Sequence, residues 1–247
     1  MSQLDLSLTA EVSARHISFL ETGRSKPSVE MVLLLADALE VPMRDVNELL
    51  RAAGFDGRYP EPTIDALLTG PLGDTIDTML EHHQPFPMMV VDRLYNLVRT
   101  NKAGVTLFAL ANVDVLAAGS REVNVLRLMF DPSNREMIGE WDRSASTILR
   151  RLQRESFHRP HDAEMATLLD DLISTPGVPE AWRQPNFGEP DEPMLTLEFR
   201  AGDMAMKFLT TMTEFNAPQN VTLEELRIES YFPLDDETRS LCQQLAG

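Results

Sequence analysis

The stretch SQLDLSLTAEVSARHISFLETGRSKP, residues 2–27, decides the fold of the N-terminal part of the chain, because it predicts two short helices joined by a tight turn. Ser2 is a natural N-cap of the first helix, and Ser13 is the N-cap of the second. Gly23 ends the second helix, since glycine readily takes the left-handed conformation of a C-cap. The apolar face of the first helix is predicted to consist of Leu4, Leu6, Leu8 and Ala10.

The second helix is expected to present its N-terminal end to the outside. Val12, Ile17 and Leu20 point toward a shared core in this prediction. Helices that enter the major groove of DNA present base-contacting side chains at this end. Arginine there can bond both acceptors of a guanine, so Arg15 is the first candidate for base recognition. The side chains expected to face bases are those of Ala14, Arg15, His16 and Ser18.

The flanking residues are expected to hold the DNA backbone. Gln3 opens the first helix with its N-terminal amides, and Arg24 and Lys26 follow the second helix directly. Helix N-termini and cationic side chains both bind phosphate oxygens. The complete predicted DNA interface comprises Gln3, Ser13, Ala14, Arg15, His16, Ser18, Arg24 and Lys26.

The spacing of these residues resembles the lambda-repressor-like helix-turn-helix of the XRE class, with its pattern SQ..L......VS...IS..E.G...P. The matching positions are Ser2, Gln3, Leu6, Val12, Ser13, Ile17, Ser18, Glu21, Gly23 and Pro27. Two more helices are predicted over 29–39 and 44–53. The sequence departs from the class in two ways: the first helix has no counterpart, and Glu11 stands where the class usually has glycine with positive φ, at a cost of about 1 kcal/mol.

The charge of the chain limits the kind of DNA binding that is expected. The formal net charge is −17, from 22 basic and 39 acidic residues, and residues 1–58 contain six basic and nine acidic ones. Non-specific DNA affinity depends on phosphate neutralisation, so a histone-like binder is excluded. We expect a homodimer on a two-fold site, since pairing adds affinity. A ligand-binding or protein-interaction module that does not bind DNA is the alternative.

Prolines and a glycine in residues 56–62, DGRYPEP, interrupt the helical period. The expected organisation is a DNA-binding domain at 1–58, a linker at 59–70 and a second domain at 71–247. One cysteine, Cys242, excludes an internal disulfide and is expected to be a packed thiol. The sequence contains neither a leader-like segment nor a long apolar run, so a cytoplasmic protein without membrane association is expected.

The pattern after residue 71 predicts an α+β domain with an antiparallel sheet and covering helices. Two strands around Asp92 are followed by helices and then by a three-strand meander. The predicted strands are 87–91, 95–99, 194–200, 204–214 and 226–232, and the helices are 102–110, 125–130, 137–157, 162–173 and 235–245. This order of elements is that of a PAS-like domain.

Three segments resemble the signature stretches of MmyB-type regulators, in which an XRE helix-turn-helix precedes a PAS-like ligand-binding domain. They are PFPMMVVDRLYNLVRTNKAG at 85–104, NVLRLMFDP at 124–132 and EFNAPQNVTLEELRIESYFPLD at 214–235. The resemblance implies a transcription factor that binds double-stranded DNA. It also implies that the second domain binds a fatty-acid-like or similarly apolar small molecule.

The residues of this domain are compatible with such a ligand. A sheet face with Val90, Leu97, Leu197, Phe199 and Phe208 could enclose an elongated cavity under the helices. The alternative is that these side chains fill a solid core, as most apolar faces do. The helical residues expected over the sheet are Leu107, Phe108, Leu126, Met129, Ile148 and Leu152.

An acidic head group would need partners, because burial of an unpaired carboxylate is costly. Arg127 lies within the apolar run NVLRLMF and is the first candidate, with Asn101 and Asn124 as further donors. Alternatively, Arg127 extends to solvent or pairs with a carboxylate. Arg150, Arg151 and Arg154 are expected on a solvated helix face. The predicted ligand site comprises Asn101, Leu107, Phe108, Asn124, Leu126, Arg127, Met129, Ile148, Leu152 and Phe199.

An enzyme is the third alternative. His158 and His161 lie three residues apart beside Asp162, but Pro160 breaks the helix that would align them. The sequence has no glycine-rich phosphate loop and no G-x-S-x-G motif. We therefore expect no catalytic residue, no metal and no cofactor other than a bound fatty acid or similar lipid.

Overall fold

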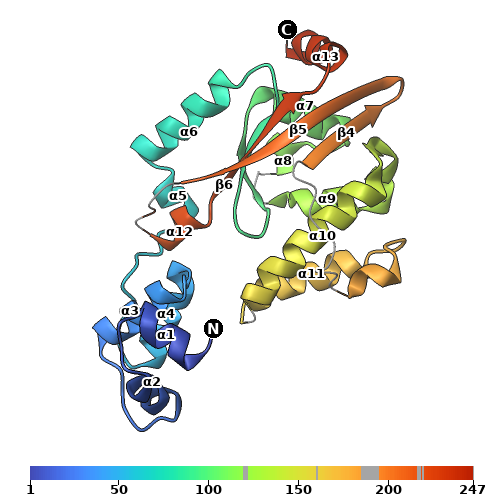
Figure 1. The fold of residues 1–247 in the computed structure, drawn as a ribbon. Helices are drawn as coiled ribbons and strands as arrows, with labels where there is room; N and C mark the ends of the chain where they lie inside the picture. Colours follow the sequence, from blue (N-terminus) through green and yellow to red (C-terminus); the bar gives the residue numbers. More distant parts are fainter. Residues whose placement is uncertain (119–121, 160, 185–194, 216–217, 219, 247) are drawn as a thin grey trace. The chain divides into compact units, whose positions relative to one another are not determined.

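The computed structural model describes residues 1–118, 122–159, 161–184, 195–215, 218 and 220–246 (Figure 1). The chain forms two compact units, one of Met1–Leu67 with Phe215–Glu225 and one of Leu68–Glu214 with Leu226–Gly247. The expected domains were continuous in sequence, whereas the first unit includes a second segment from late in the chain. This segment links the first unit to the last strand of the sheet.

The first unit is helical, and its first three helices begin at serines. Ser2, Ser13 and Ser28 each accept a hydrogen bond from the backbone amide three residues on, and this satisfies a donor that the helix leaves free. The helices are α1 Gln3–Thr9, α2 Ala14–Glu21, α3 Val29–Ala38, α4 Met43–Ala52, α5 Ile64–Leu67 and α12 Val221–Glu224. Val32, Ala36, Val46 and Leu50 form the buried cluster between α3 and α4.

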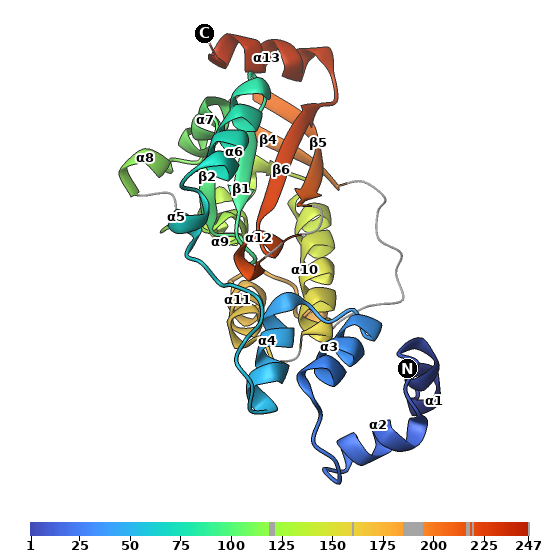
Figure 2. The ribbon, with the colours of Figure 1, turned by 90° about the vertical axis from the view of Figure 1, so that its left-hand side faces the viewer.

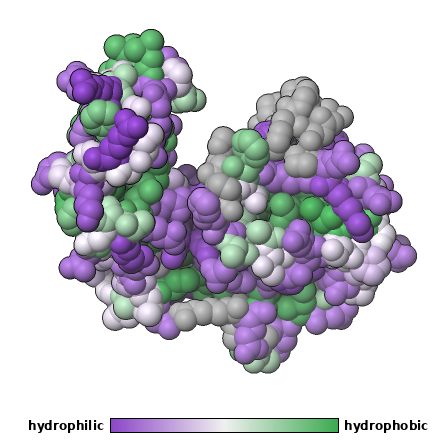
Figure 3. All heavy atoms as spheres, turned by 90° about the horizontal axis from the view of Figure 1, so that it is seen from below, coloured by the Kyte–Doolittle hydropathy of each residue, from purple (hydrophilic) through white to green (hydrophobic). Residues whose placement is uncertain are grey.

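The turn between α1 and α2 has the predicted positive φ at Glu11, 51°. The predicted apolar face of α1 was wrong in two positions, because Leu4 and Leu8 are 62% and 71% exposed while Ala10 is buried. Residues two apart on a helix point about 200° away from each other, so an alternating series cannot share one face. Figure 3 shows hydrophobic side chains at separate places on an otherwise mainly hydrophilic surface.

Asn47 of α4 fastens the proline-containing segment that follows the helix. Its side chain is fully buried. Its Nδ2 donates to the Tyr59 carbonyl at 2.8 Å and to Glu61 Oε1 at 2.7 Å. Its Oδ1 accepts from the amides of Arg58 and Tyr59 at 2.8 and 2.9 Å. One side chain therefore holds the start of the segment that the sequence predicted as a linker.

The second unit contains a curled antiparallel sheet, which has six strands within the described residues, in the order β2-β1-β6-β5-β4-β3. The predicted meander is confirmed as β4, β5 and β6. The helix predicted over 137–157 was wrong at its start, where the short β3 lies before α10. Met194, the predicted first residue of β4, lies outside the described residues. The strands are β1 Met88–Val91, β2 Leu97–Thr100, β3 Ile138–Gly139, β4 Leu195–Ala201, β5 Met204–Glu214 and β6 Arg227–Pro233.

Helices cover both faces of this sheet (Figures 1 and 2). α6, Pro71–His82, lies on one face, and α7, α9, α10 and α11 pack on the other, which we call the inner face. The bounds are α7 Lys102–Leu110, α8 Val115–Ala118, α9 Val125–Phe130, η2 Pro132–Met137, α10 Trp141–His158, α11 Ala163–Ser174, η3 Glu180–Arg183 and α13 Asp236–Ala246.

The strand pairing decides which residues belong to the inner face. A bulge between Val90 and Val91 pairs Val90 with Arg99 and Val91 with Leu97. Val90 therefore lies on the α6 side and not with Leu97, contrary to the prediction, because facing residues of an antiparallel pair share a face. Cys242 of α13 is packed as expected, and burial raises the pKa of its thiol to about 11.

Replacement of Asn47 by alanine should remove its four hydrogen bonds. The alanine side chain has no donor or acceptor that could replace them. At about 1 kcal/mol for each net hydrogen bond, we expect a loss of about 2–4 kcal/mol in local stability. Hydrogen exchange of the α4 amides in the full chain measures this loss. Glu48→Ala, at the exposed neighbouring position, is the control. Equal protection in both variants would contradict the assignment.

Candidate DNA interface and apolar cavity

The outer side of α2 is accessible, as the sequence predicted. Arg15 is exposed and His16 is partly exposed, whereas Ile17 is buried. The guanidinium carbon of Arg15 lies 5.2 Å from the centroid of the Phe19 ring, one turn further along the helix. This cation–π contact orders Arg15 without burying it. Its donors therefore remain available to a base edge.

The other predicted DNA-contacting residues lie around the same helix. Ser13 caps α2 by accepting from the His16 amide at 3.2 Å. Arg24 and Lys26 are exposed just beyond the helix, and Ala14 and Ser18 are half-buried. The side chain of Gln3 donates to Glu21, so it is already engaged within the unit.

An apolar cavity of about 90 Å³ lies on the inner face of the sheet in the second unit. Four of the predicted ligand residues line it, namely Leu107, Phe108, Met129 and Phe199. The remaining wall consists of Met89, Leu110, Ala111, Val125, Leu128, Asn134, Met137, Ile138, Leu197, Arg200 and Tyr231. The space is thus lined by α7, α9, the η2–β3 segment and the sheet.

The other predicted apolar residues pack beside the cavity but do not line it. Leu126, Ile148 and Leu152 are buried in the same core. Asn101 and Asn124 cap α7 and α9. The Asn101 amide also donates to the carbonyls of Leu80 and Phe86. Both asparagines are therefore occupied by structural hydrogen bonds.

Arg127 does not face the cavity, contrary to the expectation. Its side chain is 51% exposed and pairs with Asp171 at 2.6 Å. The six-residue helix α9 buries Leu126, Met129 and Phe130, which leaves position 127 on the outer side. Arg127 instead reaches solvent and pairs with a carboxylate, which was the alternative expectation.

The structure also contains a buried polar cluster that sequence reasoning missed. The Tyr95 hydroxyl accepts from Arg151 Nη2 at 2.6 Å and from Arg227 Nη1 at 2.9 Å. Arg227 also donates to Glu155 at 3.2 Å. Glu229 is buried on the same strand as Arg227. The alternation of Arg227, Glu229 and Tyr231 in a predicted strand was the available signal, because residues two apart share a face.

The electrostatics of the cluster are set by burial. Burial raises the pKa of the Glu229 carboxyl, and the positive charge of Arg151 partly opposes this rise. The pKa of Tyr231 is well above its ordinary value, because of burial first and then of the Glu229 charge. Arg151, expected on a solvated face, is partly buried, and its Nε atom is inaccessible and unbonded. Arg151 is held inward by the Tyr95 hydroxyl.

Two models of known families match the chain. The model of the MmyB-like transcription regulator ligand binding domain matches residues 72–245. The chain belongs to this family. A helix-turn-helix model matches residues 1–46. The MmyB-like regulator is therefore a DNA-binding transcription regulator with a ligand-binding domain. No curated protein matched the sequence.

No group of three His, Cys, Asp or Glu side chains is gathered as a metal site in the described part of the regulator. The segment between His158 and His161 includes Pro160, which lies outside the described residues. None of the described helices combines the length and the apolar character needed to cross a bilayer.

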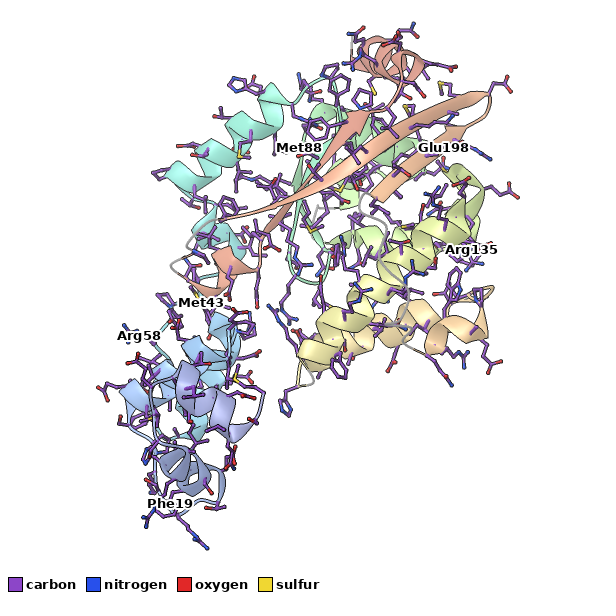
Figure 4. All side chains as sticks on the ribbon, in the orientation of Figure 1. Phe19, Met43, Arg58, Met88, Arg135 and Glu198 are labelled. Carbon is purple, nitrogen blue, oxygen red and sulfur yellow. The ribbon has the colours of Figure 1, made fainter. Side chains whose placement is uncertain are left out.

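Replacement of Arg15 by methionine should weaken operator binding by about 1–3 kcal/mol, the usual contribution of a bidentate arginine to base discrimination. The effect should be larger on the operator than on unrelated DNA. Fluorescence anisotropy on both duplexes measures it. Arg58→Met is the control. It also removes one positive charge, but Arg58 and Phe19 lie at opposite ends of the unit (Figure 4). Equal losses in the two variants would exclude base recognition by Arg15.

Replacement of Ala111 by phenylalanine should fill the cavity, because Ala111 forms part of its wall. A saturating ligand at 100 times its Kd stabilises a protein by about 2.7 kcal/mol. We expect this ligand-induced rise in Tm in the wild type and its loss in Ala111→Phe. The control is Ala109→Phe on the exposed side of α7. A full Tm rise in Ala111→Phe would place the ligand elsewhere.

Proposed function

We propose that the regulator binds its operator as a homodimer and that an apolar small molecule of the fatty-acid class, bound in the cavity, changes operator affinity. The observation that carries this proposal is the apolar wall of the cavity in a chain whose α2 presents an exposed arginine. Apolar ligands favour enclosed sites with few polar groups. Cavity residues of the helices and the sheet would contact the alkyl chain.

In this proposal Arg15 reads a base, and Arg24 and Lys26, which follow α2, hold phosphates. Three cations give one copy only a small electrostatic contribution, since the affinity depends on the number of phosphates neutralised. Two copies on a two-fold operator would double the number of contacts and place two recognition helices in successive major grooves. The acidic net charge of the chain supports this need for pairing.

A physical link between ligand and DNA is provided by the segment before β6. Glu224 Oε2 accepts from the Met43 amide at 2.9 Å, at the start of α4, where Pro42 gives no side-chain cap. Glu225 accepts from Arg44 Nε and Nη2 at 2.7 and 2.9 Å. Leu226 joins this segment directly to β6, whose Tyr231 lines the cavity. A shift of β6 on ligand binding would thus reach α4 through covalent bonds and a bidentate ion pair.

Operator affinity measured with and without saturating dodecanoate tests the function. Linkage requires the ligand to bind the DNA-competent and DNA-incompetent arrangements unequally. We expect the operator Kd to change by about 5- to 150-fold, the usual range of allosteric coupling. An unchanged Kd at full ligand occupancy would exclude regulation by this ligand class.

Replacement of Glu225 by glutamine should reduce the coupling while leaving both binding events in place. The variant keeps the shape of the side chain but loses the charge that pairs with Arg44. We expect the ligand-induced change in operator Kd to fall by at least about half in free-energy terms. Glu48→Gln, which removes the same charge from the exposed side of α4, is the control. Identical coupling in the wild type and Glu225→Gln would contradict this route.

A further inference from the structure

We propose that Arg151, Glu229 and Tyr231 form the anchor for an anionic ligand head group, and that Glu229 takes up a proton when the anion binds. The inference rests on the proposed function, because it concerns the polar end of the same ligand site. It assigns the role first expected of Arg127 to a different arginine. It also adds a proton to the binding reaction.

The anchor is placed beside the cavity by the strand register. Glu229 pairs with Met89 across the β1–β6 ladder and precedes Tyr231 by two residues on the same strand. Met89 and Tyr231 both line the cavity. Side chains directly opposite each other in an antiparallel ladder lie about 5 Å apart at Cβ. Glu229 therefore shares the inner face with two residues of the cavity wall, without itself lining the cavity.

The two arginines that share the Tyr95 hydroxyl differ in their counter-charges. Arg227 lies within 3.2 Å of Glu155 and 3.8 Å of Glu214. Among the described residues, no carboxylate forms an ion pair with Arg151, and its buried Nε atom has no hydrogen-bond partner. A desolvated cation without an ion pair costs free energy unless an anion compensates it. Arg151 is thus the guanidinium with unused capacity for an anion.

Glu229 lies near enough to Arg151 to offset part of its charge when the site is empty, although the two form no ion pair. Burial raises the pKa of its carboxyl, the charge of Arg151 lowers it, and the Tyr231 hydroxyl stabilises the ionised form by a hydrogen bond. Tyr95, Glu155 and Arg227 complete the titratable groups of the cluster. The side chains facing Glu229 from β1 and β5 are those of Met89 and Met212, which carry no charge.

An incoming anion competes with Glu229 for the charge of Arg151. The negative charge of the ligand then disfavours ionised Glu229, so the carboxyl takes a proton from solvent. The bound state contains cationic Arg151, the anion and neutral Glu229, with the same net charge as the empty site. Binding should therefore weaken as pH rises, because fewer molecules then hold the required proton.

Octane-1-sulfonate and 1-octanol test this inference on the full-length protein, below their micellar concentrations. The two probes share an alkyl chain, and the sulfonate stays anionic across the pH range, so any proton taken up belongs to the protein. We expect about ten-fold or more tighter binding of the sulfonate. Calorimetry in phosphate and in Tris, whose ionisation enthalpies differ, should show uptake of up to about one proton for each sulfonate and none for octanol.

Variants separate the two roles. Arg151→Met should bind the sulfonate less tightly and octanol as before, so that the two probes bind with similar affinity. Glu229→Gln should keep sulfonate binding, abolish proton uptake and remove the weakening at high pH. Arg127→Met is the matched control, because Arg127 is an exposed arginine outside the cavity. It should bind both probes like the wild type.

Each remaining outcome distinguishes the inference from the function on which it rests. Equal affinities of the wild type for both probes, without proton uptake, would overturn the anchor and leave the apolar ligand site intact. Sulfonate preference that survives in Arg151→Met would assign the anion to another residue and overturn the inference. Failure of both probes to bind at all would remove the apolar site and the anchor together.

Discussion

The pairing of β6 with β1 on one side and β5 on the other is the constraint on which the rest of the structure depends. Glu229 of β6 pairs with Met89 of β1 on one side and with Met212 of β5 on the other. The pairing with β1 joins segments that are far apart in sequence. The register turns Glu229 and Tyr231 to the inner face, where the cavity lies. A slip of one residue would exchange these side chains with Ile228 and Ser230. The cavity wall and the buried polar cluster thus depend on the same register.

The same strand connects the two units of the chain. Its N-terminal end continues from α12, whose neighbour Glu225 holds Arg44 of α4 in a bidentate pair. The Glu225 side chain is only 9% exposed, so its pairing is shielded from competing water and salt. Loss of one partner of such a pair leaves the other charge uncompensated. This geometry accounts for the segment 215–225 belonging to the helical unit.

Local features of the fold were predictable because their determinants lie within a few residues of each other. Asn101, Asn124 and Asp162 each cap a helix whose apolar residues follow at once, and the predicted helices 102–110 and 125–130 have the observed bounds. The turn at Glu11 follows from the spacing in the same way. Such side-chain caps satisfy nearby backbone amides and need no tertiary context.

Features that depend on distant residues were not predictable from local pattern. Glu225 and Arg44 are separated by 181 positions, and nothing near either residue indicates the pair. Arg151 was expected in solvent because it belongs to a run of arginines, yet the Tyr95 hydroxyl holds it inward. Arg127 was expected inside because its neighbours are apolar, but the short helix α9 has an outer side at that position. Four of the predicted ligand residues still line the cavity, because their apolar character and the spacing of the helices and of strand β4 were sufficient.

The central claim is that the occupancy of the cavity and the occupancy of the operator are energetically coupled. Coupling between two binding equilibria is reciprocal, so the operator must change ligand affinity by the factor by which the ligand changes operator affinity. Calorimetric titration of dodecanoate into the free protein and into the operator complex measures this factor directly. The account predicts two ligand dissociation constants whose ratio equals the ratio found for the operator. The same ligand dissociation constant with and without operator would contradict it.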